Sequence, residues 1–446
     1  MLSPWDIGSL SSICFLLRET LAPLVLRKFT LTQIYGSLAS LRKATAMTAS
    51  PAWLQSIVEL ELRNNDGHHA IRDIGVIPAV SRTLRAVPKM TRLQTVILTN
   101  TRLSSSQLVI VLRAPKLRKI TLIGVILPEL ALTKLPPTSV RHLNLQITGE
   151  WGNAILLWTH LSASLEVLEL QRPKHSDKLP PLPPCPRLHT FVYVPTITAS
   201  DFPERRFHEF INSCPNLTRV TTSVTFPHPL QIDMFPSTLR HLCLHHDLLY
   251  FNSSNAQLPG LVSFRITGLE DLYTVQAVLS IAQYINSHFP NLLELELEIS
   301  WAQRNHALAL ARFVLSVRTL HLVITTTFGL KADANSPYWG TEYTDILWGH
   351  IGRQKQSAKL QRLSLEVTQY TRPLDDTTSA FLSWWMTIIT TYLGGLGGPD
   401  LSETDITYFC PGTSPPESDI RRWCHSKSAD DGSWSFTFGD WYKSEG

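Results

Sequence analysis

Closely spaced cysteines are absent from this sequence of 446 residues. The six cysteines stand far apart and form no Cys-x-x-Cys pair; they are Cys14, Cys185, Cys214, Cys243, Cys410 and Cys424. A disulfide framework and a zinc ribbon both need cysteines at short, regular spacing, so we expect neither. The sequence therefore indicates free thiols and a cytoplasmic or nuclear location.

Long apolar runs are also missing. No apolar stretch reaches the roughly 18 residues that a membrane-spanning helix needs. Residues 7–17 are as apolar as the core of a signal peptide, but Asp6 precedes them and no basic segment does. Because a signal peptide begins with such a basic segment, we expect no cleaved signal and no membrane contact.

The common catalytic signatures are missing as well. The sequence has neither the phosphate-binding pattern GxxxxGKS or GxxxxGKT nor the nucleophile pattern GxSxG. His208-Glu209 lacks the second histidine of a zinc-protease helix, and the glycines at 394–398 open no phosphate-binding helix. The sequence predicts a protein that is not an enzyme and has no cofactor.

One group of residues has the side-chain types of a metal site. His241, Cys243 and His245 alternate along the chain and would share one face of a strand. Same-face neighbours on a strand lie about 7 Å apart, which is too wide for two adjacent ligands to converge on a tetrahedral ion. We therefore expect no metal site.

Acidic residues are scarce in the first third of the chain. Residues 1–150 carry 18 lysines and arginines against 8 aspartates and glutamates, a net charge of +10, and the remainder has a net charge of −6. A basic segment of this kind can mark contact with nucleic acid or with an acidic protein. Arg113, Lys116, Arg118 and Lys119 lack interleaved aromatic residues for base stacking. We interpret them as solvated charges and expect no nucleic-acid partner.

A repeated six-residue phrase is what the sequence does contain. It has an apolar residue, two others, a second apolar residue, one other and a third apolar residue, as in Leu117-Arg-Lys-Ile-Thr-Leu122. The twelve copies begin at Ile57, Leu93, Leu117, Val140, Leu165, Leu188, Leu217, Leu239, Leu261, Leu292, Val317 and Leu360. Most starts lie 22 to 31 residues apart, a spacing typical of leucine-rich repeats.

Each copy of this apolar phrase predicts a strand. Its second and third apolar residues point to one strand face, and the residues beside them point to the other. The intervals are long enough for crossovers between parallel strands, and such crossovers are right-handed. We predict an α/β fold: a right-handed leucine-rich-repeat solenoid of twelve degenerate repeats, with parallel strands on the concave face and helices or loops on the convex face.

Prolines and the return segments add detail to this prediction. Proline precedes the apolar phrase by two or three residues at Pro115, Pro137, Pro186, Pro215, Pro236, Pro259 and Pro290. We expect it to end the preceding segment and to give an extended entry into the strand. Helices are predicted over 275–287, 302–315, 342–353 and 378–392. The last of these and a strand over 433–442 are expected to cap the final coil.

The N-terminal residues carry a family resemblance. Asp6 is a candidate N-cap for a helix over 7–19, and the passage continues through Leu21-Ala-Pro-Leu24 to Leu31. It resembles the second half of an F-box as found in fungal F-box/leucine-rich-repeat proteins, in which a helix is followed by a leucine-proline-leucine run and a strand. The Cys-Pro and Phe-Pro strand entries at Cys185, Cys214 and Phe289 are similar too. The resemblance implies a partial F-box over 1–31; the repeat pattern predicts the solenoid over 32–370 and a cap and tail over 371–446.

The same resemblance implies a substrate receptor of a Skp1-cullin-F-box ubiquitin ligase. The leucine-proline-x-glutamate helix of that family does not precede Trp5, so we expect weak or no binding to a Skp1-type adaptor. The usual repeat asparagine is also replaced, by Thr101, Val125, Thr148, Asp247 and Thr325. We therefore expect no continuous asparagine ladder.

The outward strand positions give a candidate partner site, because their charge changes sign between neighbouring repeats. The candidate residues on the predicted concave face are Arg219, His241, His245, Arg265, Glu294, Glu296, Glu298, His321 and Glu366. The alternative is that this face is simply solvated. The sequence thus predicts a non-enzymatic protein-recognition module, monomeric outside complexes, that binds a protein client; the other candidate is a stand-alone scaffold without a ligase role.

Overall fold

The computed structural model describes separate segments of the chain. They are residues 27–33, 38–64, 78–129, 135–146, 152–171, 182–194, 204–222, 232–245, 256–268, 275–300, 310, 314, 316–326, 361–369, 403–410, 419–427, 434–438 and 442–443. The helices predicted over 7–19, 342–353 and 378–392 lie outside the described residues, as does nearly all of the one predicted over 302–315. The described chain divides into two units, Met1–Thr218 and Arg219–Gly446.

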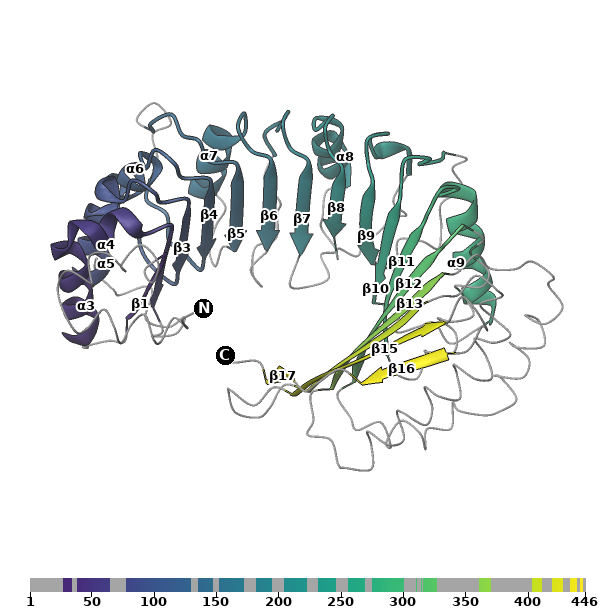
Figure 1. Ribbon diagram of the computed structural model, residues 1–446. Coiled ribbons are helices and arrows are strands. Elements are labelled where there is room, and N and C mark those ends of the chain that lie inside the picture. The colour runs from purple at the N-terminus through teal and green to yellow at the C-terminus, as the bar shows by residue number, and fades with distance from the viewer. Residues whose placement is uncertain are drawn as a thin grey trace. The chain divides into compact units, whose positions relative to one another are not determined.

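Unit 1 contains an open sheet in which each strand pairs in parallel with the next strand of the sequence (Figure 1). Its strands are β1 (Lys28–Gln33), β2 (Glu59–Asn64), β3 (Thr95–Thr99), β4 (Lys119–Ile123), β5 (His142–Gln146), β6 (Val167–Gln171) and β7 (Thr190–Val194). Its helices are α3 (Leu38–Ala49), α4 (Pro51–Ser56), α5 (Pro78–Arg85), the short 3-10 helix η1 (Val87–Lys89), α6 (Ser105–Leu112), α7 (Gly152–Leu161) and α8 (Glu204–Asn212).

Unit 2 begins with a second run of parallel strands and ends with an antiparallel meander. The parallel strands are β8 (Arg219–Thr222), β9 (His241–His245), β10 (Ser263–Thr267), β11 (Glu294–Ser300), β12 (Thr319–Thr326), β13 (Arg362–Gln369) and β14 (Glu403–Cys410). The antiparallel strands are β15 (Asp419–Lys427), β16 (Trp434–Phe438) and β17 (Tyr442–Lys443). The 3-10 helix η3 (Ile232–Met234) and helix α9 (Val275–His288) belong to the return segments.

Every copy of the apolar phrase coincides with one of the strands from β2 to β13, so the α/β class and the parallel pairing are confirmed. The predicted helix over 275–287 is confirmed as α9. The predicted strand over 433–442 is confirmed over Trp434–Phe438 as β16 and at Tyr442, where β17 begins; residues 433 and 439–441 lie outside the described residues. Strand β1 lies where the F-box resemblance implies a strand, whereas β14 and β15 were not predicted.

The same backbone contact joins successive coils within each unit. The carbonyl of the second residue in one phrase accepts two N–H groups from the next phrase: Val58 O accepts from Gln94 at 2.8 Å and from Thr95 at 3.1 Å. The contact recurs at the carbonyls of Arg27, Gln94, Arg118, Arg141, Glu166, Arg240, Val262, Leu293 and Arg318. Each strand therefore begins at the same level as its neighbour, which gives the sheet a constant register.

A tight turn leads into most of these strands. The first residue of the phrase donates its N–H to the carbonyl three residues earlier, as Leu117 does to Ala114 at 3.2 Å and Leu292 to Phe289 at 3.2 Å. Pro115 and Pro290 occupy the second position of this turn, where the fixed φ of proline fits. The expected extended entry was wrong at these prolines, because they form a turn instead.

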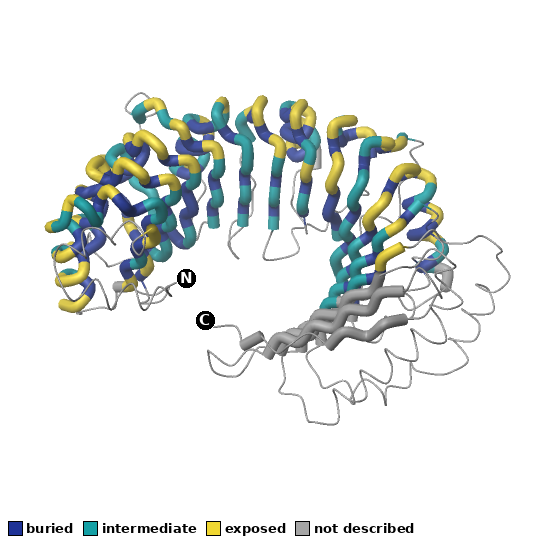
Figure 2. Tube along the Cα trace, in the orientation of Figure 1, coloured by how far each residue is buried: buried dark blue, intermediate teal, exposed yellow. Residues whose placement is uncertain are grey.

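The core of each unit consists of alternate residues of the strands together with residues of the return segments, and these buried positions are dark blue in Figure 2. In unit 1, Phe191 of β7 packs against Phe210 of α8 with ring centroids 4.9 Å apart, and Phe210 lies 5.7 Å from Trp158. In unit 2, Phe264 of β10 lies 4.9 Å from Phe289. The opposite strand face carries the outward residues, and we call it the open face of the unit.

Candidate functional site

The candidate residues predicted from the sequence lie on the open face of unit 2. The first outward residue of each strand pairs in register with that of the next strand. This row, which we call the entry row, consists of Arg219, His241, Ser263, Glu294, Thr319 and Arg362. Arg219, His241 and Glu294 are exposed, so they are accessible from solvent.

The next positions along the strands form an ion-pair cluster around Arg265. Its Nη1 lies 2.9 Å from Oε1 of Glu296, and its Nη2 lies 3.2 Å from Oε2 of Glu298. Half-burial works to lower the pKa of Arg265, but the two carboxylates outweigh this effect and raise the pKa above its usual value. The glutamates therefore find their counter-charge within unit 2.

His241, Cys243 and His245 share the open face of β9, as the alternation predicts. The Cys243 side chain is buried, and burial raises the pKa of its thiol to about 11, so it is a thiol rather than a thiolate at neutral pH. His245 packs against Gly268, which follows β10. Among the described residues, no group of three or more histidine, cysteine, aspartate or glutamate side chains is placed to hold a metal ion.

His321 and Glu366, the last two candidates, face each other from the adjacent strands β12 and β13. The distance from His321 Nε2 to Glu366 Oε2 is 3.9 Å, and both side chains are partly exposed. The structure thus brings together Arg265 with Glu296 and Glu298, and His321 with Glu366. The other exposed candidates, Arg219, His241 and Glu294, lie on the entry row.

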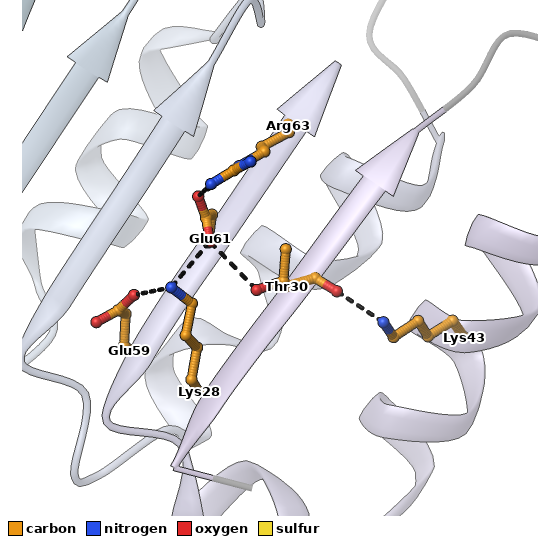
Figure 3. A network of polar contacts seen from close by, with 6 residues as sticks. All are labelled: Lys28, Thr30, Lys43, Glu59, Glu61 and Arg63. Carbon is orange, nitrogen blue, oxygen red and sulfur yellow. Dashed lines mark hydrogen bonds and ion pairs between the residues drawn. The ribbon is translucent and has the colours of Figure 1, made fainter. Parts of the chain in front are cut away.

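The open face of unit 1 has a charged network that the sequence analysis missed (Figure 3). Glu61 of β2 is buried and accepts contacts from Lys28 at 3.2 Å, from the hydroxyl of Thr30 at 3.2 Å and from Arg63. Lys28 also lies 2.8 Å from Glu59. The signal for this network was the charged alternation of residues 59–63 together with the preceding apolar phrase at Leu26.

Opposing effects set the ionisation of this buried carboxylate. Burial works to raise the pKa of Glu61, but hydrogen bonds from Arg63 and Lys28 outweigh it and hold the pKa below the ordinary value of 4.5. Glu61 is therefore ionised at neutral pH, and its charge is neutralised within the sheet.

A second network on the open face of unit 1 centres on Glu169 of β6. His142 Nε2 lies 2.8 Å from one carboxylate oxygen, and Asn144 Nδ2 donates to the other at 2.5 Å. The contact with His142 lowers the pKa of Glu169 more than partial burial raises it. Charged and amide groups on this face thus bind one another across neighbouring strands and hold fixed positions.

Comparison with other proteins supplies no family. No protein-family profile matches the chain, and no curated protein matches it significantly. In the part of the chain that the structure describes, no helix is both long and apolar enough to cross a membrane.

Proposed function

We propose that this chain is a non-enzymatic protein-recognition module of the leucine-rich-repeat type, and that its open sheet face in unit 2 binds a partner protein. The observation that supports the repeat assignment best is the paired backbone contact between successive phrases, which recurs at nearly every described coil. It fixes each outward side chain at a set level, so the face is organised before any partner arrives.

The residues proposed to meet the partner are the exposed members of the entry row. Glu294 lies between strands that contribute Arg219 and His241 on one side and Arg362 on the other. A row of mixed charge mainly directs encounter and selects a complementary partner. Glu296 and Glu298 hold Arg265 instead, so they shape the face and offer less free charge.

The experiment begins with a photo-crosslinking residue at position 294, which captures the partner for identification. Association of the purified partner is then measured for Glu294→Lys, with Asp233→Lys as the control, because Asp233 is exposed on η3 outside the strands. We expect slower association for Glu294→Lys alone, with unchanged melting of both variants. Equal association rates for the two variants would contradict the proposal.

Ubiquitin-ligase receptor activity is the more specific form of this function. It is supported by the resemblance at residues 1–31, in which a leucine-proline-leucine run leads into a strand; β1 begins at Lys28. A pull-down of the full chain with a Skp1-type adaptor tests it. We expect weak or no adaptor binding, which would favour the stand-alone scaffold, whereas tight binding would support the receptor role.

A further inference from the structure

A line of exposed cations borders the strand entries of unit 1. The line, which we call the basic edge, consists of Lys89, Arg92, Arg113, Lys116, Arg118 and Arg141. All six are exposed, and they precede or begin the strands β3, β4 and β5. None of them belongs to the entry row of unit 2.

The backbone of this edge is held in register. Arg118 donates its N–H to Gln94 O at 2.8 Å, and Arg141 donates in the same way to Arg118 O at 2.8 Å. Arg92 and Lys116 occupy equal positions one residue before their phrases. Strands of a sheet lie about 4.8 Å apart, so cations of successive coils follow one another at nearly that interval.

Acidic groups do little to neutralise this edge. Arg141 lies 2.8 Å from Glu166, but no described carboxylate lies within ion-pair distance of the other five cations. Helix ends favour cations at their C-termini, which accounts for Arg113 at the end of α6 and Lys89 at the end of η1. Arg92 and Lys116 lie in the turns that enter the strands, and Arg118 lies between its turn and β4, so the fold itself gives no reason for their charge.

The neighbours of these cations favour a peptide over a nucleic acid. Pro88 and Pro115 are exposed next to Lys89 and Lys116 and offer rigid apolar surface for side chains of a polypeptide. Single-stranded nucleic acid binds on exposed aromatic rings, and the large exposed apolar side chains among the described residues are Leu38 and Leu293. A fixed row of cations complements carboxylates spaced along an extended chain.

We propose that the basic edge binds an acidic segment of a partner protein, rich in aspartate or glutamate. This is a second recognition surface in addition to the open face of unit 2. Association with it is electrostatically steered, and it weakens as salt screens the exposed charges.

The test uses the full chain and a fluorescein-labelled peptide of alternating glutamate and alanine, followed by fluorescence anisotropy. The variant Arg92→Glu/Arg118→Glu reverses two charges of the basic edge. The matched control Arg42→Glu/Arg102→Glu reverses two exposed arginines elsewhere in unit 1, on α3 and after β3, and gives the same net charge. Thermal melting of each variant monitors folding, and Arg92→Gln/Arg118→Gln serves as a milder second variant.

We expect the edge variant to weaken peptide binding about tenfold or more, which corresponds to about 1.4 kcal/mol, while the control stays within about twofold. Equal losses in both variants would show a response to net charge alone and would overturn the proposal, as would a wild-type chain that does not bind the peptide. Mixed-sequence RNA and vesicles containing phosphatidylserine are the competing probes. Tighter binding of either through Arg92 and Arg118 would also overturn it.

Discussion

At the scale of single residues, one backbone feature repeats at the strand exits. Asn100, Gly124 and Gly268 each stand seven residues after the start of an apolar phrase, and each has a positive φ, of 51°, 63° and 71°. Glycine and asparagine tolerate this left-handed region better than other residues. The Asn100 side-chain amide also donates to Asn64 O at 3.4 Å. A single asparagine contact between neighbouring strands therefore occurs one position before Thr101, where the usual repeat asparagine would stand.

The substitution Gly268→Ala should destabilise unit 2. The added Cβ would be strained by the φ of 71° and would lie 2.0 Å from His245 Nε2, so the histidine ring must move. We expect a loss of at least about 1 kcal/mol in the free energy of unfolding, measured by urea denaturation. Gly152→Ala is the control, because nothing lies within 4 Å of its Cβ, and it should be neutral or slightly stabilising. Equal stability of the two variants would contradict the claim that Gly268 is required by its positive φ and by the nearby His245 ring.

Glu61 should make the free energy of unfolding of the wild type depend on pH in the acidic range. Its pKa in the folded state is below the ordinary 4.5, so its stabilising effect is complete above pH 4.5 and is lost as the pH falls through the folded pKa. Glu61→Gln should cost roughly 1–3 kcal/mol at neutral pH, since Lys28 and Arg63 lose a charged acceptor. Urea denaturation from pH 7 to pH 3 should show this difference shrinking as the pH falls. A difference that stays constant over that range would exclude the ionised Glu61 as its source.

At the scale of elements, the strands were predictable where the apolar phrase is intact. β1 was expected only from the F-box-like passage, although Leu26, Phe29 and Leu31 have the same spacing as the apolar phrase. The pairing of Arg265 with Glu296 follows from register, since both stand four residues after the start of their phrases. From the sequence these charges were expected to be available to a partner; the register instead sets Arg265 of β10 against Glu296 of β11, so part of the charge is compensated within the sheet.

Side chains of helix α3 form hydrogen bonds with backbone carbonyls of strand β1. Among the described strands β1 pairs with β2, and helix α3 supplies donors to two β1 carbonyls. Ser40 Oγ donates to Thr32 O at 2.9 Å, and Lys43 Nζ donates to Thr30 O at 2.8 Å. Lys43 also lies 5.5 Å from the centre of the Phe29 ring. Helix α3 thus satisfies backbone acceptors that would otherwise remain available to another strand.

The substitution Ser40→Ala should therefore destabilise unit 1 by roughly 0.5–1.5 kcal/mol, because the hydrogen bond from the buried Ser40 hydroxyl to Thr32 O is lost. Thr45→Ala is the control in the same helix. The Thr45 hydroxyl donates to Leu41 O at 2.8 Å within α3, so its removal leaves β1 untouched and improves helix propensity. Urea denaturation measures both variants. A greater loss for Thr45→Ala would show that α3 does not act through the β1 edge.

At the scale of the whole molecule, each described coil is stabilised by the coils beside it in the sequence. Leu297 of β11 is fully buried and lies in register with Ile266 of β10 and Leu322 of β12. Leu145 of β5 is equally buried between Leu122 of β4 and Leu170 of β6. If the proposed repeat architecture is right, stability is approximately a sum of repeat and nearest-neighbour terms, and a local defect stays local.

Leu297→Ala and Leu145→Ala should each cost roughly 2–5 kcal/mol, because the buried methyl groups leave a cavity that their coil cannot close. Hydrogen exchange measured along the chain should locate the damage. We expect Leu297→Ala to reduce protection in β10, β11 and β12 while β4, β5 and β6 keep theirs, and Leu145→Ala to do the reverse. Each variant is the control for the other, since both remove the same atoms from a fully buried strand position. If either substitution lowered protection equally in both sets of strands, the molecule would unfold as one cooperative body, and the nearest-neighbour account of its stability would be wrong.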